Sequence, residues 1–100
     1  MDKYILDGKR LVKCENLLEW AKHIESDSRC VARTKIKDTL ISTVFLGIDH
    51  SFNDKGPPIL FETAVFVGRC ALGQEIYRHE TWEEAVKVHR EIIARVKKET

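Results

Sequence analysis

The sequence predicts an α+β protein with a mainly antiparallel sheet of five to six strands and two helices packed on one face. Short segments that alternate in polarity or are rich in β-branched and aromatic residues indicate the strands, and two segments with apolar residues at helical spacing indicate the helices. Their order, β-β-α-β-β-β-β-α, places strands next to one another along the chain, which is typical of antiparallel sheets. With 100 residues, of which 43% are hydrophobic, a single domain spanning the whole chain with one core is expected.

The amino-terminal half is predicted to begin with a hairpin. Strands are expected at 4–6 and 11–13, because the Asp7-Gly8 pair between them favours a tight turn. A helix is expected over 15–26, where apolar residues recur on one helical face after a capping Asn16. Segment 30–36 alternates in polarity and is predicted to be a half-buried strand that ends in a turn at Lys37 and Asp38.

The carboxy-terminal half contains the most apolar strands. Segments 39–46 and 59–67 have the composition of central strands, and 75–79 is expected as a further strand. The run Thr81-Trp82-Glu83-Glu84 has the form of a capping box, in which the threonine oxygen accepts from the amide of Glu84 and the glutamate reaches back to the threonine amide. It predicts the start of a helix that continues to the basic residues 97 and 98.

Composition excludes several classes of protein. The formal net charge is +1, so no global field attracts nucleic acid or an anionic membrane. Cys14, Cys30 and Cys70 fit neither a disulfide framework nor a cysteine metal site, and reduced thiols in the cytoplasm are expected. No run is long and apolar enough for a membrane span or a signal peptide, and no cofactor or structural metal is expected.

The polar loop at 48–58 is the first candidate for a functional site, because long loops in small domains are often functional. Asp49 and His50 follow a strand and could orient a general base or ligate a metal, although Asp49 could equally cap the loop by accepting from backbone amides. Phe52 could anchor an interface, since aromatic residues are enriched where binding energy concentrates.

Four further residues are candidates on strands and helices. Glu62 lies in an apolar strand and needs a partner such as Arg33, Lys35 or His50 if it is buried; otherwise it lies on a partly solvated face. Arg33 and Lys35 belong to a basic row on one strand face, which could bind phosphate or be solvated. His89 lies on the apolar stripe of the second helix and is expected to pack as a hydrogen-bonded core residue. His23 and His79 are expected on the surface.

Five segments carry a resemblance to a known family. The runs STVFLGIDHSF, GPPILFET and YRHETWEEAVKVH, together with YILDGK and LLEWAK, resemble a family of small uncharacterised proteins encoded by bacteriophages and prophages. The resemblance covers nearly the full length. It implies a phage or prophage protein acting in the cytoplasm of a bacterial host, and it supplies no catalytic or binding residue.

Three functions remain open from the sequence. The leading hypothesis is a non-enzymatic accessory protein, for example one that acts in counter-defence, that binds a host or phage macromolecule through the 48–58 loop and neighbouring sheet residues. A second is a protein that binds a nucleotide or another small molecule through Arg33, Lys35 and the loop. A third is a metal-dependent hydrolase that uses Asp49, His50 and Glu62, with His89 as a further candidate. A protein partner is favoured over nucleic acid, and an edge strand could pair with a second copy of the chain to form a homodimer.

Overall fold

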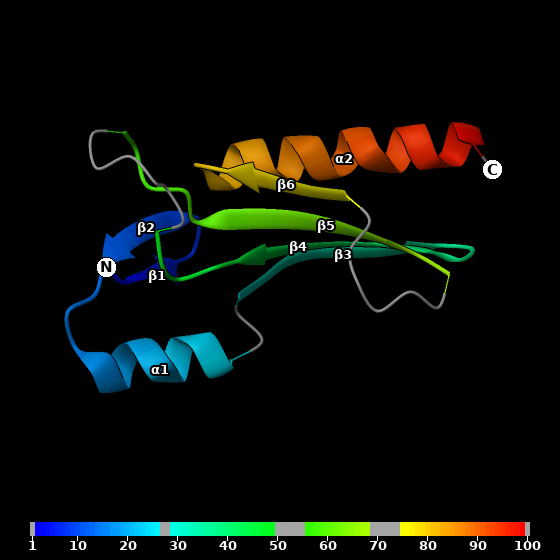
Figure 1. Cartoon of the computed structure of the whole chain (residues 1–100). Helices are drawn as coiled ribbons and strands as arrows, with labels where there is room; N and C mark the ends of the chain where they lie inside the picture. The colour runs from blue at the N-terminus through cyan, green and yellow to red at the C-terminus, as the bar shows by residue number, and fades with distance from the viewer. Residues whose placement is uncertain (1, 27–28, 50–55, 69–74, 100) are drawn as a thin grey trace.

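Two antiparallel sheets and two helices make up the described part of the chain, which is residues 2–26, 29–49, 56–68 and 75–99 of a computed structural model. The α+β class and the element order are confirmed (Figure 1). The strands are β1 (Tyr4–Asp7), β2 (Arg10–Lys13), β3 (Cys30–Ile36), β4 (Thr39–Phe45), β5 (Phe61–Val67) and β6 (Glu75–His79), and the helices are α1 (Leu17–Glu25) and α2 (Trp82–Glu99).

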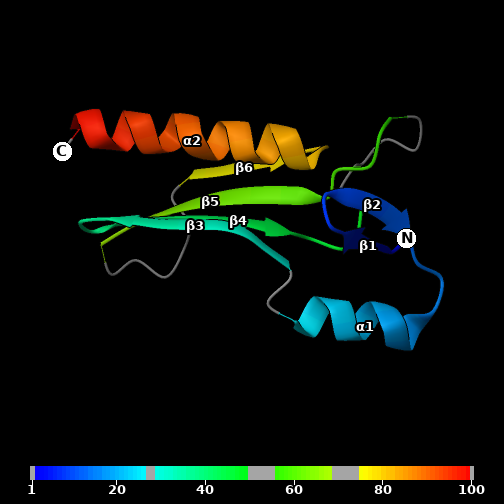
Figure 2. The same cartoon turned by 180° about the vertical axis from the view of Figure 1, so that it is seen from behind.

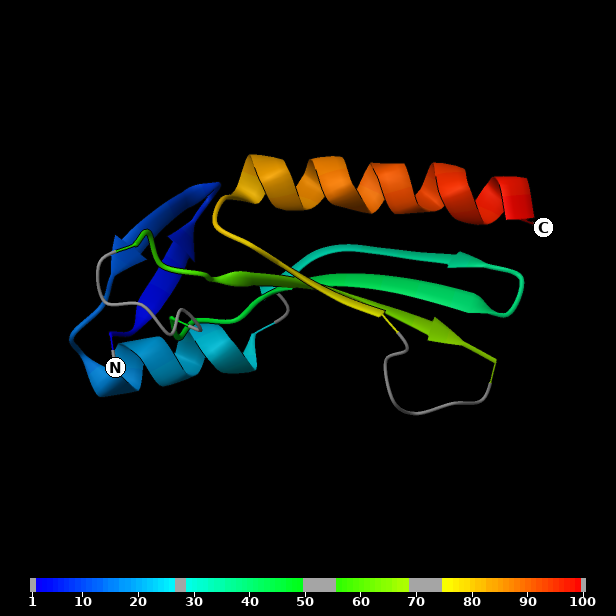
Figure 3. The ribbon, with the colours of Figure 1, turned by 45° about the horizontal axis from the view of Figure 1, so that its top comes forward.

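The strands are divided between two sheets, where a single sheet of five to six strands was expected. β3, β4, β5 and β6 form an antiparallel meander in that order, and β1 pairs only with β2. The small ribbon stands at one end of the larger sheet (Figure 3). The division arises at Gly47, where a positive φ of 78° follows the end of β4. The amide of Tyr4 donates to the Gly47 carbonyl over 2.8 Å, so β1 is joined to the chain beyond β4 and not to the sheet itself.

The helices lie on opposite sides of the larger sheet, and the expectation that both pack on one face is wrong (Figures 1 and 2). α2 has 18 residues and packs against all four strands, so it covers one face alone. α1 has 9 residues, none of them buried, and it packs against β1 on the other side. The longer helix therefore leaves no room on its face for the shorter one.

The core lies between α2 and the sheet in two apolar clusters. One cluster lies under the start of α2 and contains Leu6, Phe45, Leu60, Phe61 and Ala85; the other lies under its later turns and contains Ile41, Val65, Ile92 and Val96. Along β4, β5 and α2, the residues between these clusters are Thr43, Thr63 and His89, all buried. A polar layer thus separates the two halves of the core.

A β-bulge changes the predicted alternation at the start of β3. Cys30 pairs with Val44 and Ala32 pairs with Thr43, so β3 has one extra residue at Val31. From residue 32 onward the alternation is as expected. Val31 packs against the first apolar cluster, and Cys30 is exposed.

Gly47 contacts α1 and helps to fix the position of this helix. The indole nitrogen of Trp20 donates to the Gly47 carbonyl over 3.0 Å. A Cβ added at Gly47 would collide with the end of the Ile24 side chain and lie 3.2 Å from the Trp20 indole nitrogen. Close approach and the left-handed backbone both require glycine here.

We expect Gly47→Ala to destabilise the fold more than Gly8→Ala. Both positions have positive φ, 78° and 65°, but a Cβ at Gly8 has nothing within 4 Å. Gly8→Ala should therefore cost about 1 kcal/mol of unfolding free energy from backbone strain alone, and Gly47→Ala about 2–3 kcal/mol. Chemical denaturation measures both, and equal losses would show that the contact with α1 does not stabilise the fold.

Candidate functional site

The predicted loop site is described only at its two ends. The carboxylate oxygen Oδ1 of Asp49 accepts a hydrogen bond from the Ile59 amide over 2.8 Å, which ties the two ends of the loop together. Ile48 forms a β-bridge with Lys3, so the base of the loop is also tied to the amino terminus. Asp49 therefore has the capping role that its residue type allows. His50 and Phe52 lie outside the described residues, and their binding roles stay predictions.

Arg33, Lys35 and Glu62 share one face of the four-stranded sheet, the face opposite α2. Arg33 pairs with Ser42 and Lys35 with Leu40, and Ser42 and Leu40 pair in turn with Ala64 and Phe66 of β5. Residues paired across antiparallel strands point to the same side, and alternate residues of one strand do so too. The three candidates are therefore brought onto one surface.

This surface, which we name the open face, has apolar residues in its middle rows and charges toward both edges. It comprises Arg33, Lys35, Leu40, Ser42, Val44, Glu62, Ala64, Phe66, Ile76 and Arg78. No helix in the described part of the chain covers its middle, since α1 lies under the end next to β1 (Figures 1 and 2). Leu40, Val44, Ala64 and Phe66 are partly exposed, and Ile76 is 54% exposed.

The charges of the open face are mostly positive. Glu62 accepts from Arg78 over 3.3 Å, which gives it a partner that the sequence analysis did not consider. Arg33 and Lys35 form no ion pair with any described residue. Three cations and one carboxylate leave a charge of +2 on this surface. Glu62 is partly exposed, in agreement with a partly solvated strand face.

His89 lies on the other face of the sheet, at the centre of a buried chain of hydrogen bonds. Its Nε2 is 2.9 Å from the Thr34 hydroxyl, and its Nδ1 is 2.7 Å from the Thr43 hydroxyl. Thr43 in turn lies 2.7 Å from the Thr63 hydroxyl, which is 2.9 Å from Nε2 of His79. His89 is thus a hydrogen-bonded core residue as expected, and its partners are threonine side chains.

His79 ends this chain and is buried, with 3% of its surface exposed, so the expectation of a surface histidine is wrong. The cause is strand register. His79 pairs with Phe61, a core residue, and therefore points toward α2. Its Nδ1 lies 3.8 Å from a carboxylate oxygen of Glu84. Strand alternation places Glu75, Tyr77 and His79 on the same face of β6. The local sequence did not show whether this face or the other one points inward, so the burial of His79 could not be predicted from it.

One of the two hydrogen bonds of the predicted capping box between Thr81 and Glu84 is present among the described residues. The Glu84 amide donates to the Thr81 hydroxyl over 3.1 Å, as expected. Its carboxylate faces His79. Among the described residues, the Thr81 amide donates no hydrogen bond to this carboxylate. The acid that was expected to cap the helix is therefore the charged neighbour of the buried imidazole.

The carboxylate of Glu84 sets the direction of the whole chain. A hydrogen on Nδ1 of neutral His79 faces this carboxylate more favourably than a lone pair, so Nε2 must accept from Thr63. Since each threonine has one hydroxyl hydrogen, Thr63 then accepts from Thr43, and Thr43 accepts from Nδ1 of His89. Nε2 of His89 is left to accept from Thr34. We infer that both histidines carry their hydrogen on Nδ1.

The three candidate hydrolase residues that the structure describes, Asp49, Glu62 and His89, are not brought together. Glu62 belongs to the open face, whereas His89 lies between the sheet and α2 with both ring nitrogens engaged. Asp49 lies beyond the end of β4 at the loop. Among the described residues there is no group of three or more histidine, cysteine, aspartate or glutamate side chains that could hold a metal ion.

Comparisons with known proteins do not assign the site. No protein-family model, curated protein or solved structure matches the chain. The resemblance to phage and prophage proteins therefore stays a prediction. Within the described residues, neither helix has the length and apolar character needed to cross a membrane.

We expect the stability of the fold to decrease as the pH falls below about 6.5, the ordinary pKa of histidine. Burial lowers the pKa of His79 and of His89, although the nearby Glu84 carboxylate raises that of His79 in part. Below pH 6.5 the unfolded chain then binds more protons than the folded one, which favours unfolding until the folded-state pKa values are crossed. Each histidine contributes at most about 1.4 kcal/mol per pH unit.

Chemical denaturation at several pH values from about 7.5 to about 5.0, a range around the ordinary histidine pKa, measures how the free energy of unfolding changes with pH. Glu75, whose pKa is lowered by hydrogen bonds from Tyr77 and Arg95, adds its own loss only at more acidic pH. Nitrogen chemical shifts report the Nδ1–H tautomers directly. A flat stability profile, or histidine pKa values at or above 6.5 by NMR, would contradict the prediction.

We expect Thr63→Val to destabilise the fold by about 2–4 kcal/mol, because it leaves the hydroxyl hydrogen of Thr43 and Nε2 of His79 without a buried partner, while the Thr43 oxygen still accepts from His89. Thr39→Val is the control, since Thr39 is also buried in the sheet but its hydroxyl makes no hydrogen bond with a described residue. The double variant Thr43→Val, Thr63→Val should lose less stability than the sum of the losses of the two single variants, because both substitutions remove the same hydrogen bond. Additive losses would show that the hydroxyls are not coupled.

Proposed function

We propose that the protein is a non-enzymatic binding module that docks a protein partner on the open face of its sheet. The observation that carries the proposal is a sheet face with partly exposed apolar residues in its middle and, toward one edge, two cations that form no ion pair with a described residue. Contiguous apolar surface with a charged margin is the usual anatomy of a protein interface. The proposal extends the sequence hypothesis, since Arg33, Lys35 and Glu62 belong to this surface.

The chemistry of the partner follows from the charge of the open face. Arg33 and Lys35 make no ion pair with a described residue, so an acidic segment with apolar side chains complements them. A second copy of the chain fits this surface less well, because it would bring two faces of charge +2 together. Pairing through the free edge of β3 stays a prediction for a homodimer.

Nucleic acid fits the open face less well than protein. Binding of single strands uses several aromatic side chains on which bases stack. Phe66 is the one aromatic residue among the described residues of this face. The apolar residues around it, Leu40, Val44 and Ile76, are typical of contacts with protein side chains. The proposal follows the implied phage setting, with the partner in the bacterial cytoplasm and counter-defence as one possible role.

The proposal is tested by site-specific cross-linking in a bacterial host. A photo-crosslinking amino acid in place of Ile76, on the open face, should capture a defined protein, and the same amino acid in place of Glu83, on the exposed side of α2, should not. The captured protein is then purified and its affinity measured by calorimetry. Capture only from position 83 would place the interface on the helix and overturn the proposal.

We expect the double variant Arg33→Glu, Lys35→Glu to weaken binding of the purified partner by about tenfold or more, because it changes the charge of the open face from +2 to −2. The matched control is Lys87→Glu, Arg90→Glu, which makes the same change in net charge on α2 and should leave the affinity unchanged. Ile76→Ser should weaken binding without changing charge. Equal affinity of the wild type and the open-face variants would refute the proposed interface.

A further inference from the structure

A groove of about 490 Å³ lies on the other side of the molecule, between the tip of the β1–β2 hairpin and α2. Trp82, Val86 and Arg90 recur every fourth residue and form one stripe along the helix. Lys9 projects from the hairpin, with its Nζ 4.6 Å from the centre of the Trp82 ring. The groove is within the size range of small-molecule sites and larger than an inorganic ion needs.

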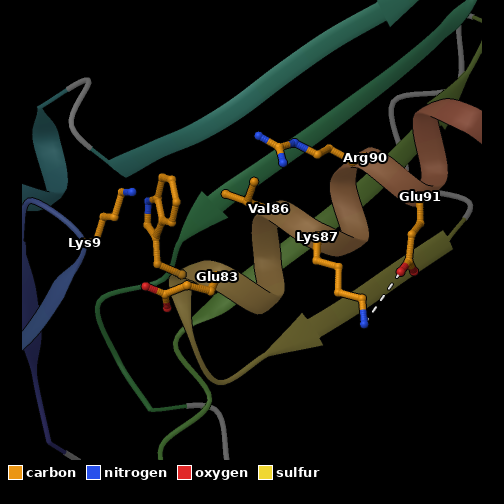
Figure 4. Close-up of a pocket in the computed structure, with 7 residues that line it drawn as sticks. Lys9, Glu83, Val86, Lys87, Arg90 and Glu91 are labelled. Carbon is orange, nitrogen blue, oxygen red and sulfur yellow. Dashed lines mark ion pairs between the residues drawn. The ribbon is translucent and has the colours of Figure 1, made fainter.

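Two cations of the groove, Lys9 and Arg90, form no ion pair with a described residue, although Lys9 lies over the ring of Trp82. Figure 4 shows Lys9 and Arg90 extending from opposite ends with Val86 between them. Glu83, Lys87 and Glu91 also line the groove, so its three cations and two carboxylates leave a charge of +1. Lys87 is 4.0 Å from Glu91, so these two charges largely offset each other. Arg90 forms no ion pair with any residue that the structure describes. Because Val86 lies one helical turn after Trp82, over which Lys9 lies, and one turn before Arg90, an anion above Val86 would lie between the two cations.

The floor of the groove is apolar. Val86 is partly exposed, and Trp82 is partly buried against the first apolar cluster while its remaining surface lines the groove. Desolvation of such a floor favours a ligand with an apolar part, and the cations above it favour a negative group on that ligand. The charge and the apolar floor of the groove therefore favour the same kind of ligand, one that has both a negative group and an apolar part.

We propose that this groove binds a small molecule with a compact anionic group on a flat apolar body. The anion lies between Lys9 and Arg90, and the body lies against Val86 and the exposed part of Trp82. The anionic group could be a carboxylate or a phosphate ester, which share this chemistry. The site is independent of the open face, so its failure leaves the proposed interface untouched.

The test is an NMR titration of the full-length protein that follows the indole N–H of Trp82. The indole N–H of Trp20, which is bonded to Gly47 beside α1, serves as internal reference. The probes are naphthoate, phenyl phosphate, the neutral naphthyl methanol and inorganic phosphate. We expect a saturable shift of the Trp82 signal with naphthoate or phenyl phosphate. Naphthyl phosphate, which has the same aromatic body as naphthoate, then shows which anionic group binds more tightly. Naphthyl methanol and inorganic phosphate should bind much more weakly.

Charge variants make the test specific. Lys9→Gln and Arg90→Gln should each weaken binding by about tenfold, since each removes one charge-assisted contact. Lys98→Gln makes the same change in net charge about 12 Å further along the helix than Arg90 and should change the affinity little. The proposal is overturned if no anionic probe saturates, if inorganic phosphate binds as tightly as phenyl phosphate, or if Lys98→Gln weakens binding as much as Arg90→Gln.

Discussion

The buried hydrogen-bond chain of threonine and histidine side chains is the constraint on which the rest of the structure depends. Each of the four strands of the larger sheet and α2 contributes one member. Along the chain of hydrogen bonds these are Thr34 of β3, His89 of α2, Thr43 of β4, Thr63 of β5 and His79 of β6. A buried hydroxyl or imidazole without a partner costs about 1–3 kcal/mol, so a misplaced element leaves several such groups unpaired. Apolar contacts alone would tolerate small shifts of α2. The polar layer between the two apolar clusters fixes its rotation.

The local pattern of the sequence predicts the elements well, because strand alternation, helical spacing and caps act over a few residues. It does not predict how distant segments meet. The division into two sheets depends on the backbone turn at Gly47 and on its contacts with Tyr4 and Trp20. The side on which α1 lies depends on the same contacts. Neither can be read from the periodicity of segments 4–13 or 15–26, and both were predicted incorrectly.

The same limit applies to the candidate site. Alternation in β3 is enough to place Arg33 and Lys35 on one surface. It is not enough for Glu62, because both faces of β5 carry apolar residues. The pairing of Thr63 with Thr43 decides that face, since it places Thr63 inward and Glu62 outward. The role of Asp49 follows from residue type, whereas the burial of His79 and the pairing of Glu62 with Arg78 are consequences of register.

The buried chain and the open face are formed by alternate residues of the same strands. Ser42 precedes Thr43, Glu62 precedes Thr63 and Arg78 precedes His79. A slip of one residue in any strand would exchange the two faces, burying a charge under α2 and exposing a member of the chain to solvent. Both errors are unfavourable, so polar groups on each side of the sheet specify one register. The backbone of the surface proposed to bind a partner is therefore held in place by the interactions beneath it. On binding, the cost in conformational entropy at its charged residues is that of ordering their side chains.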